Sequence, residues 1–342
     1  MASSSAAVAR NVPAPATRLE PDAIGVAQDM VIGMASSAPA ATIGLVLAGL
    51  TAATAYGSGP VLLLTAVPMM VIANAYRRCN MWNANCGASF EWVGRAIDPY
   101  LGFLTGWLMV VAYIIGTVAE ILLLGPSVLA VFGSTTTNVW AWIVIGSAVG
   151  VVMLVIAVVG IKITAKTQVG MALIEYLILM GLAVAGLVLV LGHHPGTFPI
   201  TKGWFSLSGI DGKGGAVAGF LIAVFVYGGW DGTLYVNEEV KHRRTNPGRA
   251  AIIAVALLAM IVYYRRRVLR SARDALILGL LPLGAAGFLG WMLVRTLQNS
   301  PSTQRWSLIG IVALGLVMLL IARFVLRSPF FSIKRESDTQ GS

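Results

Sequence analysis

The stretch VYGGWDGTLYVNEEV at residues 226–240 decides how the chain is interpreted. It follows GGAVAGFLIAVF, a run apolar enough to sit in lipid. Glycine weakens any helix that contains it, and a carboxylate such as Asp231 is costly in the middle of a bilayer. The stretch is therefore either a loop between two helices or a helix that is broken at membrane depth.

The composition places the chain in a membrane. It is 57% hydrophobic and 11% charged, with a mean hydropathy of +0.82, whereas soluble domains carry roughly a quarter charged residues. The net charge of +10 does not indicate nucleic acid as a partner, because Arg and Lys cluster between apolar runs. That pattern is typical of the cytoplasmic loops of multispanning proteins, so the expected partner is the lipid bilayer.

The residues of common catalytic and metal sites are scarce. Cys79 and Cys86 lie near Arg77 and Arg78, on the side that we expect to be cytoplasmic, where a disulfide is disfavoured. The chain has three histidines, none of them near the cysteines, so neither a metal site nor another cofactor is expected. No nucleophile elbow, HExxH motif or phosphate loop occurs, and we expect the chain not to be an enzyme.

A helix needs about 20 apolar residues to cross the hydrocarbon core. A short interfacial helix is predicted at 87–97 and an external loop at 193–213, while residues 1–23, which are rich in Ala, Ser and Pro, are predicted to form a disordered tail. The candidate spans lie near 25–55, 59–77, 99–131, 138–160, 168–192, 214–240, 250–264, 275–294 and 306–322.

The basic residues predict the orientation of the first six spans. With a cytoplasmic N-terminus, the basic loops 77–98, 161–167 and 241–249 all fall inside. The nearly uncharged segment 132–137 and the mixed segment 193–213 then fall outside. This arrangement obeys the positive-inside rule.

The rule fails at AAIIAVALLAMIVYY, residues 250–264. This segment follows Arg249 and ends at RRRVLRSAR (265–273), the densest basic run in the chain. As a helix, its apolar residues would span only about 22 Å, whereas the hydrocarbon core of a bilayer is about 30 Å thick. Both flanks are basic, as cytoplasmic segments are, although a single span should have its ends on opposite sides of the membrane. An odd number of membrane-spanning helices is therefore predicted to be missing here. A re-entrant or interfacial helix is the alternative.

Three stretches together resemble the amino acid–polyamine–organocation permease superfamily. They are DMVIGMASSAPAATIG (29–44), similar to its broken first helix; NCGASFEWVGRAIDPYLGFLTGW (85–107), similar to its third helix and the loop before it; and VYGGWDGTLYVNEEVKHRRTNPGRA (226–250), similar to its broken sixth helix. The resemblance implies an all-α polytopic membrane protein with an inverted-repeat amino acid transporter fold. Helices 1 and 6 would be discontinuous.

The same resemblance implies the domain organisation. The permease domain would cover 24–327 and be followed by a cytoplasmic tail, 328–342. Within it, 24–192 would form the first repeat, 214–264 a truncated second repeat, and 275–327 the last two helices. The family's helices from part of the seventh to part of the tenth would be absent, which puts the transport activity of this chain in question.

In inverted-repeat transporters, two discontinuous helices meet at the midplane and hold the substrate with freed backbone groups. Small residues before Pro39 would leave helix N-terminal amides for a carboxylate, and carbonyls near Val226 and Tyr227 would accept bonds from an ammonium group. The predicted substrate-binding residues are Gly33, Met34, Ala35, Ser36, Ser37, Ala38, Val226, Tyr227, Gly228, Gly229, Trp230 and Asp231.

Other roles are open for several of these residues. Small residues in membrane helices also serve as packing contacts, Trp230 is either a gate or a packing aromatic, and Asp231 is favoured slightly as a helix cap. Glu175 is the candidate for coupling to an ion, with a structural, protonated acid as the equal alternative. Glu120 is interpreted as structural.

The function expected from the resemblance is secondary active transport of an amino acid or related amine by alternating access. The alternative is a transport-inactive, truncated permease that acts as a membrane partner or sensor. We expect an integral protein of the plasma membrane with a cytoplasmic N-terminus. The sequence leaves open the substrate, the oligomeric state and the coupling ion, whether proton or sodium.

Overall fold

The computed structural model describes residues 19–207, 210, 212–260 and 301–332, with a few isolated positions between 287 and 298. The described residues are helical, apart from turns and one isolated bridge. The helices are α1 (Val26–Ser36), α2 (Pro39–Thr54), α3 (Ser58–Trp82), α4 (Ser89–Ala96), α5 (Pro99–Val131), α6 (Val139–Val159), α7 (Ile161–Leu191), α8 (Gly212–Val226), α9 (Asn246–Met260) and α12 (Ser302–Leu320).

Short 3₁₀ and π turns connect or extend these helices. They are η1 (Ala55–Gly57), η2 (Lys202–Phe205), η3 (Trp230–Leu234), η4 (Asn237–Glu239), η6 (Ile321–Val325, a π-turn) and η7 (Pro329–Ser332).

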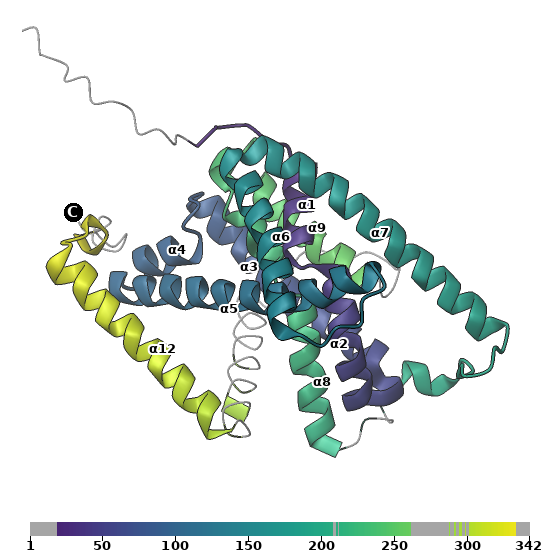
Figure 1. The fold of residues 1–342 in the computed structure, drawn as a ribbon. Coiled ribbons are helices and arrows are strands. Elements are labelled where there is room, and N and C mark those ends of the chain that lie inside the picture. The colour runs from purple at the N-terminus through teal and green to yellow at the C-terminus, as the bar shows by residue number, and fades with distance from the viewer. Residues whose placement is uncertain are drawn as a thin grey trace, which may run out of the picture.

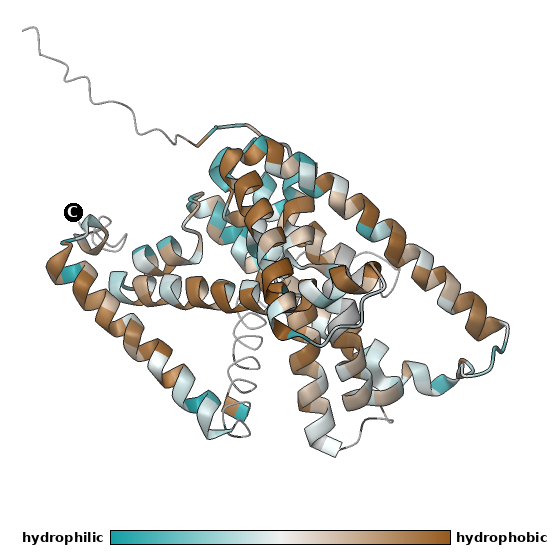
Figure 2. Ribbon diagram, in the orientation of Figure 1, coloured by the Kyte–Doolittle hydropathy of each residue, from teal (hydrophilic) through white to brown (hydrophobic). Residues whose placement is uncertain are grey.

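Six helices in the described part are long and apolar enough to cross a membrane. Their hydrophobic residues run around the whole helix, and large apolar side chains stay exposed along α5, α6, α7 and α12 (Figure 2). Such helices are stable only where lipid replaces water. The prediction of an all-α multispanning membrane protein is confirmed. These helices are Val46–Trp82, Pro99–Val131, Val139–Val159, Ile161–Leu191, Gly214–Leu234 and Ser302–Val325.

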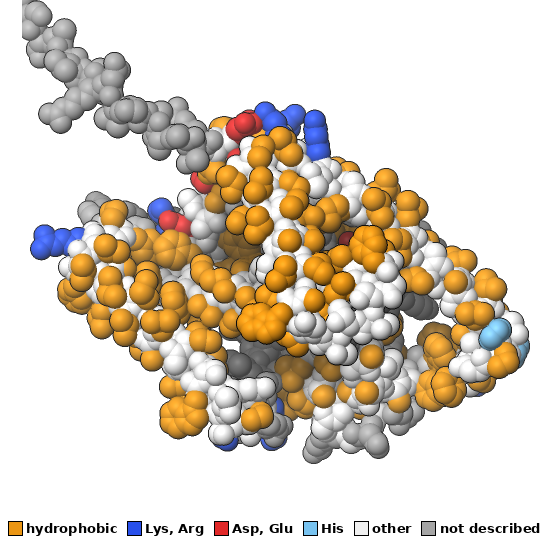
Figure 3. All heavy atoms as spheres, viewed as in Figure 1, with side chains coloured by type: hydrophobic (Ala, Val, Ile, Leu, Met, Phe, Trp, Pro, Cys, Tyr) orange, Lys and Arg blue, Asp and Glu red, His pale blue; other side chains and the backbone are white. Residues whose placement is uncertain are grey.

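The helices α1, α3 and α9 lie near the centre of the molecule (Figure 1). There α1 packs against α7, α9 and η3, while α2 packs against α8, and α3 contacts both α8 and α9. α5 lies across this centre, with α4 and α6 packed on it and α12 against one of its ends. In the face seen in Figure 3, hydrophobic side chains cover the middle, and Lys and Arg side chains gather toward the edges.

Small residues allow the central helices to approach closely. Ala250, Ala251 and Ala254 of α9 are fully buried, and α9 packs against both α1 and α3. On α5 and α6, a Cβ on Gly125 would overlap the carbonyl of Trp142. Close backbone contacts of this kind are the usual means of helix association in lipid.

The structure differs from the sequence prediction at 161–167, which is helix and not loop. The α7 helix begins at Ile161, directly after Gly160 with φ +141°. Glycine adopts this backbone conformation without strain, so α6 and α7 are joined by one residue. The segment that carries Lys162 and Lys166 therefore forms the first turns of α7.

Several predicted segments fall partly or wholly outside the described residues. In the segment 250–264, α9 accounts for residues up to Met260. The basic run 265–273 and nearly all of the span 275–294 lie outside the description, and so does most of the tail 1–23. The tail predicted from 328 begins with η7, whose Phe331 is 9% exposed and packs near Phe103 of α5.

Candidate functional site

The first break separates α1 from α2. The α1 helix ends at Ser36, and α2 begins at Pro39. Proline disfavours helical backbone in the residue before it, and Ala38 accordingly adopts a left-handed conformation, with φ 41° and ψ 61°. The break is narrower than the predicted 33–38, because only Ser37 and Ala38 leave the helix.

Side chains hold the last turn of α1 together. The Ser36 hydroxyl donates to the carbonyl of Ile32 at 2.8 Å, and the Ser37 hydroxyl donates to that of Gly33 at 3.1 Å. Across the break, Thr42 donates to the Ser37 carbonyl at 2.9 Å. Gly33, Met34, Ala35 and Ser36 thus remain helical. Their predicted unwinding is wrong, because serine hydroxyls satisfy carbonyls one turn back.

The second break separates α8 from η3. The α8 helix ends at Val226, and a turn over Tyr227–Gly229 leads into η3 at Trp230. Gly229 has φ +95°, a conformation that residues with a Cβ rarely adopt. Within the described chain, the carbonyl oxygens of Val226 and Tyr227 accept no hydrogen bond.

The two breaks meet. A Cβ on Gly229 would overlap the carbonyl of Ser36, and a Cβ on Gly33 would lie 2.5 Å from Cγ2 of Thr233 and 3.0 Å from the carbonyl oxygen of Trp230. Backbone therefore packs on backbone where the two breaks meet, and we call this contact the crossing of the breaks. After Pro39, which has no amide, the first amides of α2 have no partner within the helix, and they begin four residues beyond Ser36.

One end of this crossing is tied by backbone hydrogen bonds. The Ile24 amide donates to the carbonyl of Glu239 at 3.1 Å, and the Lys241 amide donates to that of Ile24 at 3.0 Å. These bonds form a parallel bridge between Ile24 and Val240. The start of α1 is thereby joined to the segment that links η4 with α9.

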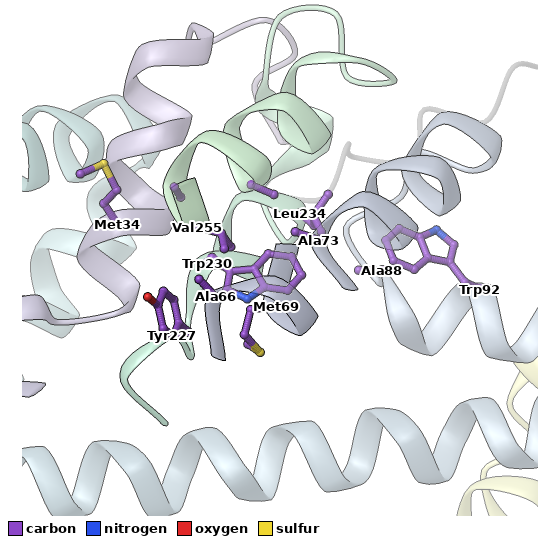
Figure 4. Packing of buried hydrophobic residues seen from close by; sticks show 12 residues of the cluster. Met34, Ala66, Met69, Ala73, Ala88, Trp92, Tyr227, Trp230, Leu234 and Val255 are labelled. Carbon is purple, nitrogen blue, oxygen red and sulfur yellow. The ribbon is translucent and has the colours of Figure 1, made fainter. Parts of the chain in front are cut away.

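Two tyrosine hydroxyls near the crossing lack partners. Tyr227 is fully buried in the central cluster, together with Met34 and Trp230 (Figure 4). Tyr176 of α7 packs against the same cluster. Neither hydroxyl has a hydrogen-bond partner among the described residues. Buried hydroxyls are normally paired, so both are available to a ligand or a water molecule.

Trp230 is a packing residue in this structure. It is 4% exposed, and its ring meets that of Tyr76 edge-on, with 5.3 Å between the centroids. Tyr76 in turn packs against Trp92 of α4 and shares a hydrogen bond of 3.0 Å with Ser89. The role of Trp230 as a gate stays a prediction.

Asp231 binds side chains, whereas the sequence favoured it as a helix cap. Its Oδ2 accepts hydrogen bonds from the hydroxyls of Tyr235 at 2.7 Å and Tyr113 at 3.4 Å. Both tyrosines line a cavity of about 620 Å³ between α4, α5 and the segment after η3. Tyr235, four residues after Asp231, is the local part of this cluster, whereas Tyr113 is 118 residues away from Asp231.

The acidic residues of the helices have different environments. Glu175 is half-buried in α7, next to Tyr176, and its coupling role stays a prediction. Asp29 of α1, which the sequence reasoning passed over, is fully buried, and neither of its oxygens has a partner in the described part of the chain. Asp29 is the only acidic residue of the predicted span 25–55. This isolated carboxylate in an apolar run could have marked it as a candidate from the sequence. No cluster of metal-binding side chains occurs among the described residues.

Comparison with known families gives one match. A family model described as amino acid permease matches residues 30–264, more than half of the chain. The matched range includes both breaks and all helices from α2 to α9. A search of curated proteins finds no match.

Proposed function

The chain belongs to the amino acid permease family, and on that premise we propose that it carries an amino acid or a related amine across the membrane by alternating access. The substrate is held where the break between α1 and α2 meets the break between α8 and η3. The observation that carries this proposal is the contact between Gly229 and the Ser36 carbonyl, because it brings two sets of unpaired backbone groups together.

The two sets suit the two ends of an amino acid. The free amides at the N-terminus of α2 attract a carboxylate through their N–H groups and the helix dipole. The carbonyls of Val226 and Tyr227 accept hydrogen bonds from an ammonium group. The Tyr227 hydroxyl is a third available group, able to donate to the carboxylate or accept from the ammonium.

The packing around the breaks divides the centre into two bodies. α1 is joined to η3 and α9 by close packing and by the Ile24–Val240 bridge. α2 and α8 pack against each other as a second pair. The breaks at Ser37–Ala38 and Tyr227–Gly229 lie between these bodies and serve as hinges, so rotation about them exposes the substrate to one side of the membrane at a time.

Counterflow in proteoliposomes tests the proposal. Vesicles that contain the purified protein and an unlabelled L-amino acid mixture receive trace radiolabelled L-amino acids outside, one at a time. We expect label to accumulate for at least one amino acid, and not in protein-free vesicles or with Gly229→Val. Wild-type protein that exchanges none of the twenty amino acids, nor their decarboxylated amines, contradicts the proposal.

A transport-inactive membrane partner or sensor is the second candidate, and the segment 250–264 favours it. Its apolar residues would span about 22 Å as a helix, which is less than the hydrocarbon core, and basic residues flank the segment at both ends. Labelling of Arg267→Cys with a membrane-impermeant thiol reagent in intact cells decides the topology. Labelling from outside shows a complete crossing and removes the support for this candidate.

A further inference from the structure

Asp29 is the least explained polar group in the described structure. Its side chain has no exposed surface, and both carboxylate oxygens lack a hydrogen-bond partner in the described part of the chain. A carboxylate that leaves water without a hydrogen bond or a counter-ion is strongly destabilised. Its burial therefore calls for a bound proton or another cation.

The position of Asp29 on α1 identifies its surroundings. Residues three and four positions apart share a helix face, so Ile32 and Gly33 lie beside it. Ile32 packs with Ala165 of α7 and with Val240, and Gly33 packs against Thr233 and Ala254. Asp29 thus lies inside the body formed by α1, η3 and α9, one turn from the crossing of the breaks.

We propose that Asp29 is a proton-binding site that couples the movement of this body to a proton gradient. The inference rests on the transport function proposed above and names its coupling ion. Asp29 accepts a proton when rotation of the body away from α7 opens α1 to water, and it carries the proton as the neutral acid when α1 packs against α7 again. The step is the binding of one proton to one carboxylate oxygen, with no other bond changed.

The lining of the site favours a proton over a metal cation. Sodium and divalent ions require several oxygen ligands, whereas the side chains packed on this face are Ala165, Val240, Ala254 and Thr233, and the Thr233 hydroxyl already donates to backbone carbonyls. No group of three or more His, Cys, Asp or Glu residues gathers anywhere in the described chain. A single carboxylate in an apolar setting holds a proton without further ligands.

The charged and titratable groups on the elements around α1 do not neutralise Asp29. Lys162 binds Glu20 at 2.6 Å, and Asp231 binds the two tyrosine hydroxyls. Lys166 and Arg249 are exposed. No hydrogen bond or ion pair joins the Asp29 carboxylate to any described residue. The full set of these groups is Lys162, Lys166, Glu175 and Tyr176 on α7, Arg249 on α9, Asp231 in η3, Tyr227 before it, and Glu20, Asp22, Glu238, Glu239, Lys241 and His242 at the tied end.

Infrared titration of the purified protein tests the site without any transport assay. A protonated, buried carboxyl gives a C=O stretching band that disappears when the proton leaves. We expect the wild type to lose such a band as the pH is raised, and Asp29→Asn to lack it. Asp22→Asn makes the same chemical change at an exposed position, where asparagine tolerates the φ of +57°, and should keep the band. Identical pH-difference spectra for the wild type and Asp29→Asn overturn the proposal.

Gradient-driven uptake tests the coupling, with the labelled amino acid that counterflow identifies as the probe. A gradient of one pH unit drives up to about tenfold accumulation per coupled proton. Asp29→Asn is expected to lose this accumulation while counterflow stays measurable, and Asp29→Ser serves as a second uncharged variant if the amide does not fold. Accumulation that is equal in the wild type and a folded, exchanging Asp29 variant overturns the coupling. Absent counterflow in the wild type overturns the transport function, and the infrared result still decides the site.

Discussion

Gly229 and the carbonyl group of Ser36 are in direct backbone contact, although 193 residues separate them. Gly229 has φ +95° and Ala38, two residues after Ser36, has φ 41°. Each chain segment leaves its helix at the point where it meets the other. This shared departure from helical geometry leaves peptide groups unpaired at the centre of an apolar protein, which only a wet cavity or a ligand can satisfy.

Substitution of Gly229 by alanine should separate the breaks. The Cβ both disfavours the positive φ and overlaps the Ser36 carbonyl, and we expect a loss of about 2–4 kcal/mol of stability together with loss of counterflow. The thermal unfolding midpoint in detergent and the counterflow rate report the two effects. Gly170→Ala on α7 is the matched control, because nothing lies within 4 Å of that site. Equal unfolding midpoints for the two variants would contradict the close crossing.

Removal of the Tyr227 hydroxyl distinguishes a binding role from a packing role. A buried hydroxyl without a partner destabilises the protein by about 1–3 kcal/mol, so Tyr227→Phe should leave stability unchanged or increased. If the hydroxyl binds substrate, the same variant should raise the KM for counterflow. Tyr176→Phe provides the comparison, since its hydroxyl is also unpaired. A KM that neither variant alters would show that these hydroxyls do not contact the substrate.

The pair Asn80–Asn237 should stabilise the region after the second break. Both side chains are fully buried, and the Asn237 amide donates to Oδ1 of Asn80 at 2.7 Å and to the carbonyl of Asn85 at 3.1 Å. Asn237→Ala leaves Oδ1 of Asn80 unpaired, while the Asn85 carbonyl keeps the hydrogen bond from the Ala88 amide, and we expect a loss of about 1–3 kcal/mol. Asn74→Ala, at a half-buried position of α3, should cost less than about 0.5 kcal/mol. Urea-induced unfolding in detergent measures both, and an equal cost would contradict the network.

The thiol of Cys86 should react slowly at neutral pH. Burial raises its pKa from 9.0 to about 11, and only the thiolate is nucleophilic. The two-unit rise lowers the thiolate fraction at pH 7 about 100-fold. Maleimide labelling of Cys79→Ala should therefore be slow at pH 7 and accelerate up to about pH 11. The reference is a protein without Cys79 and Cys86 that carries an exposed cysteine, Thr137→Cys. Equal rates of maleimide labelling at pH 7 for Cys86 and for this reference would refute the burial of Cys86.

The sequence predicts the helices better than it predicts the site. The bounds of α5 agree with the predicted 99–131, because Asp98 caps the Tyr100 amide at 2.8 Å and Pro99 begins the helix. The positions of both breaks also follow from local signals, namely Pro39 and the Gly228–Gly229 pair. The width of the first break does not, because small residues suggest unwinding while two serine hydroxyls keep the last turn of α1 helical.

Partners that are distant in the sequence account for what was missed. Of the two tyrosines that bind Asp231, Tyr113 comes from α5, and only Tyr235, four residues on, was a local signal. The sequence favoured a cap for Asp231 slightly over substrate contact. The burial of Asp29 depends on packing by α7 and α9, which no local pattern reveals. The sequence predicted the spans from the lengths of its apolar runs and the fold from the resemblance to a permease superfamily, whereas the site depends on contacts between segments more than 100 residues apart.

The accessibility of Ser36 tests the central claim most directly. In a protein without Cys79 and Cys86, Ser36→Cys places a thiol beside Gly232, three residues after Gly229, at a position exposed in the structure. We predict that a water-soluble, membrane-impermeant thiol reagent modifies it from one side of the membrane, and that at least one amino acid or related amine slows the modification several-fold. A thiol that no such reagent reaches from either side, or whose modification no amino acid or amine slows, would contradict a substrate site at the meeting of the two breaks.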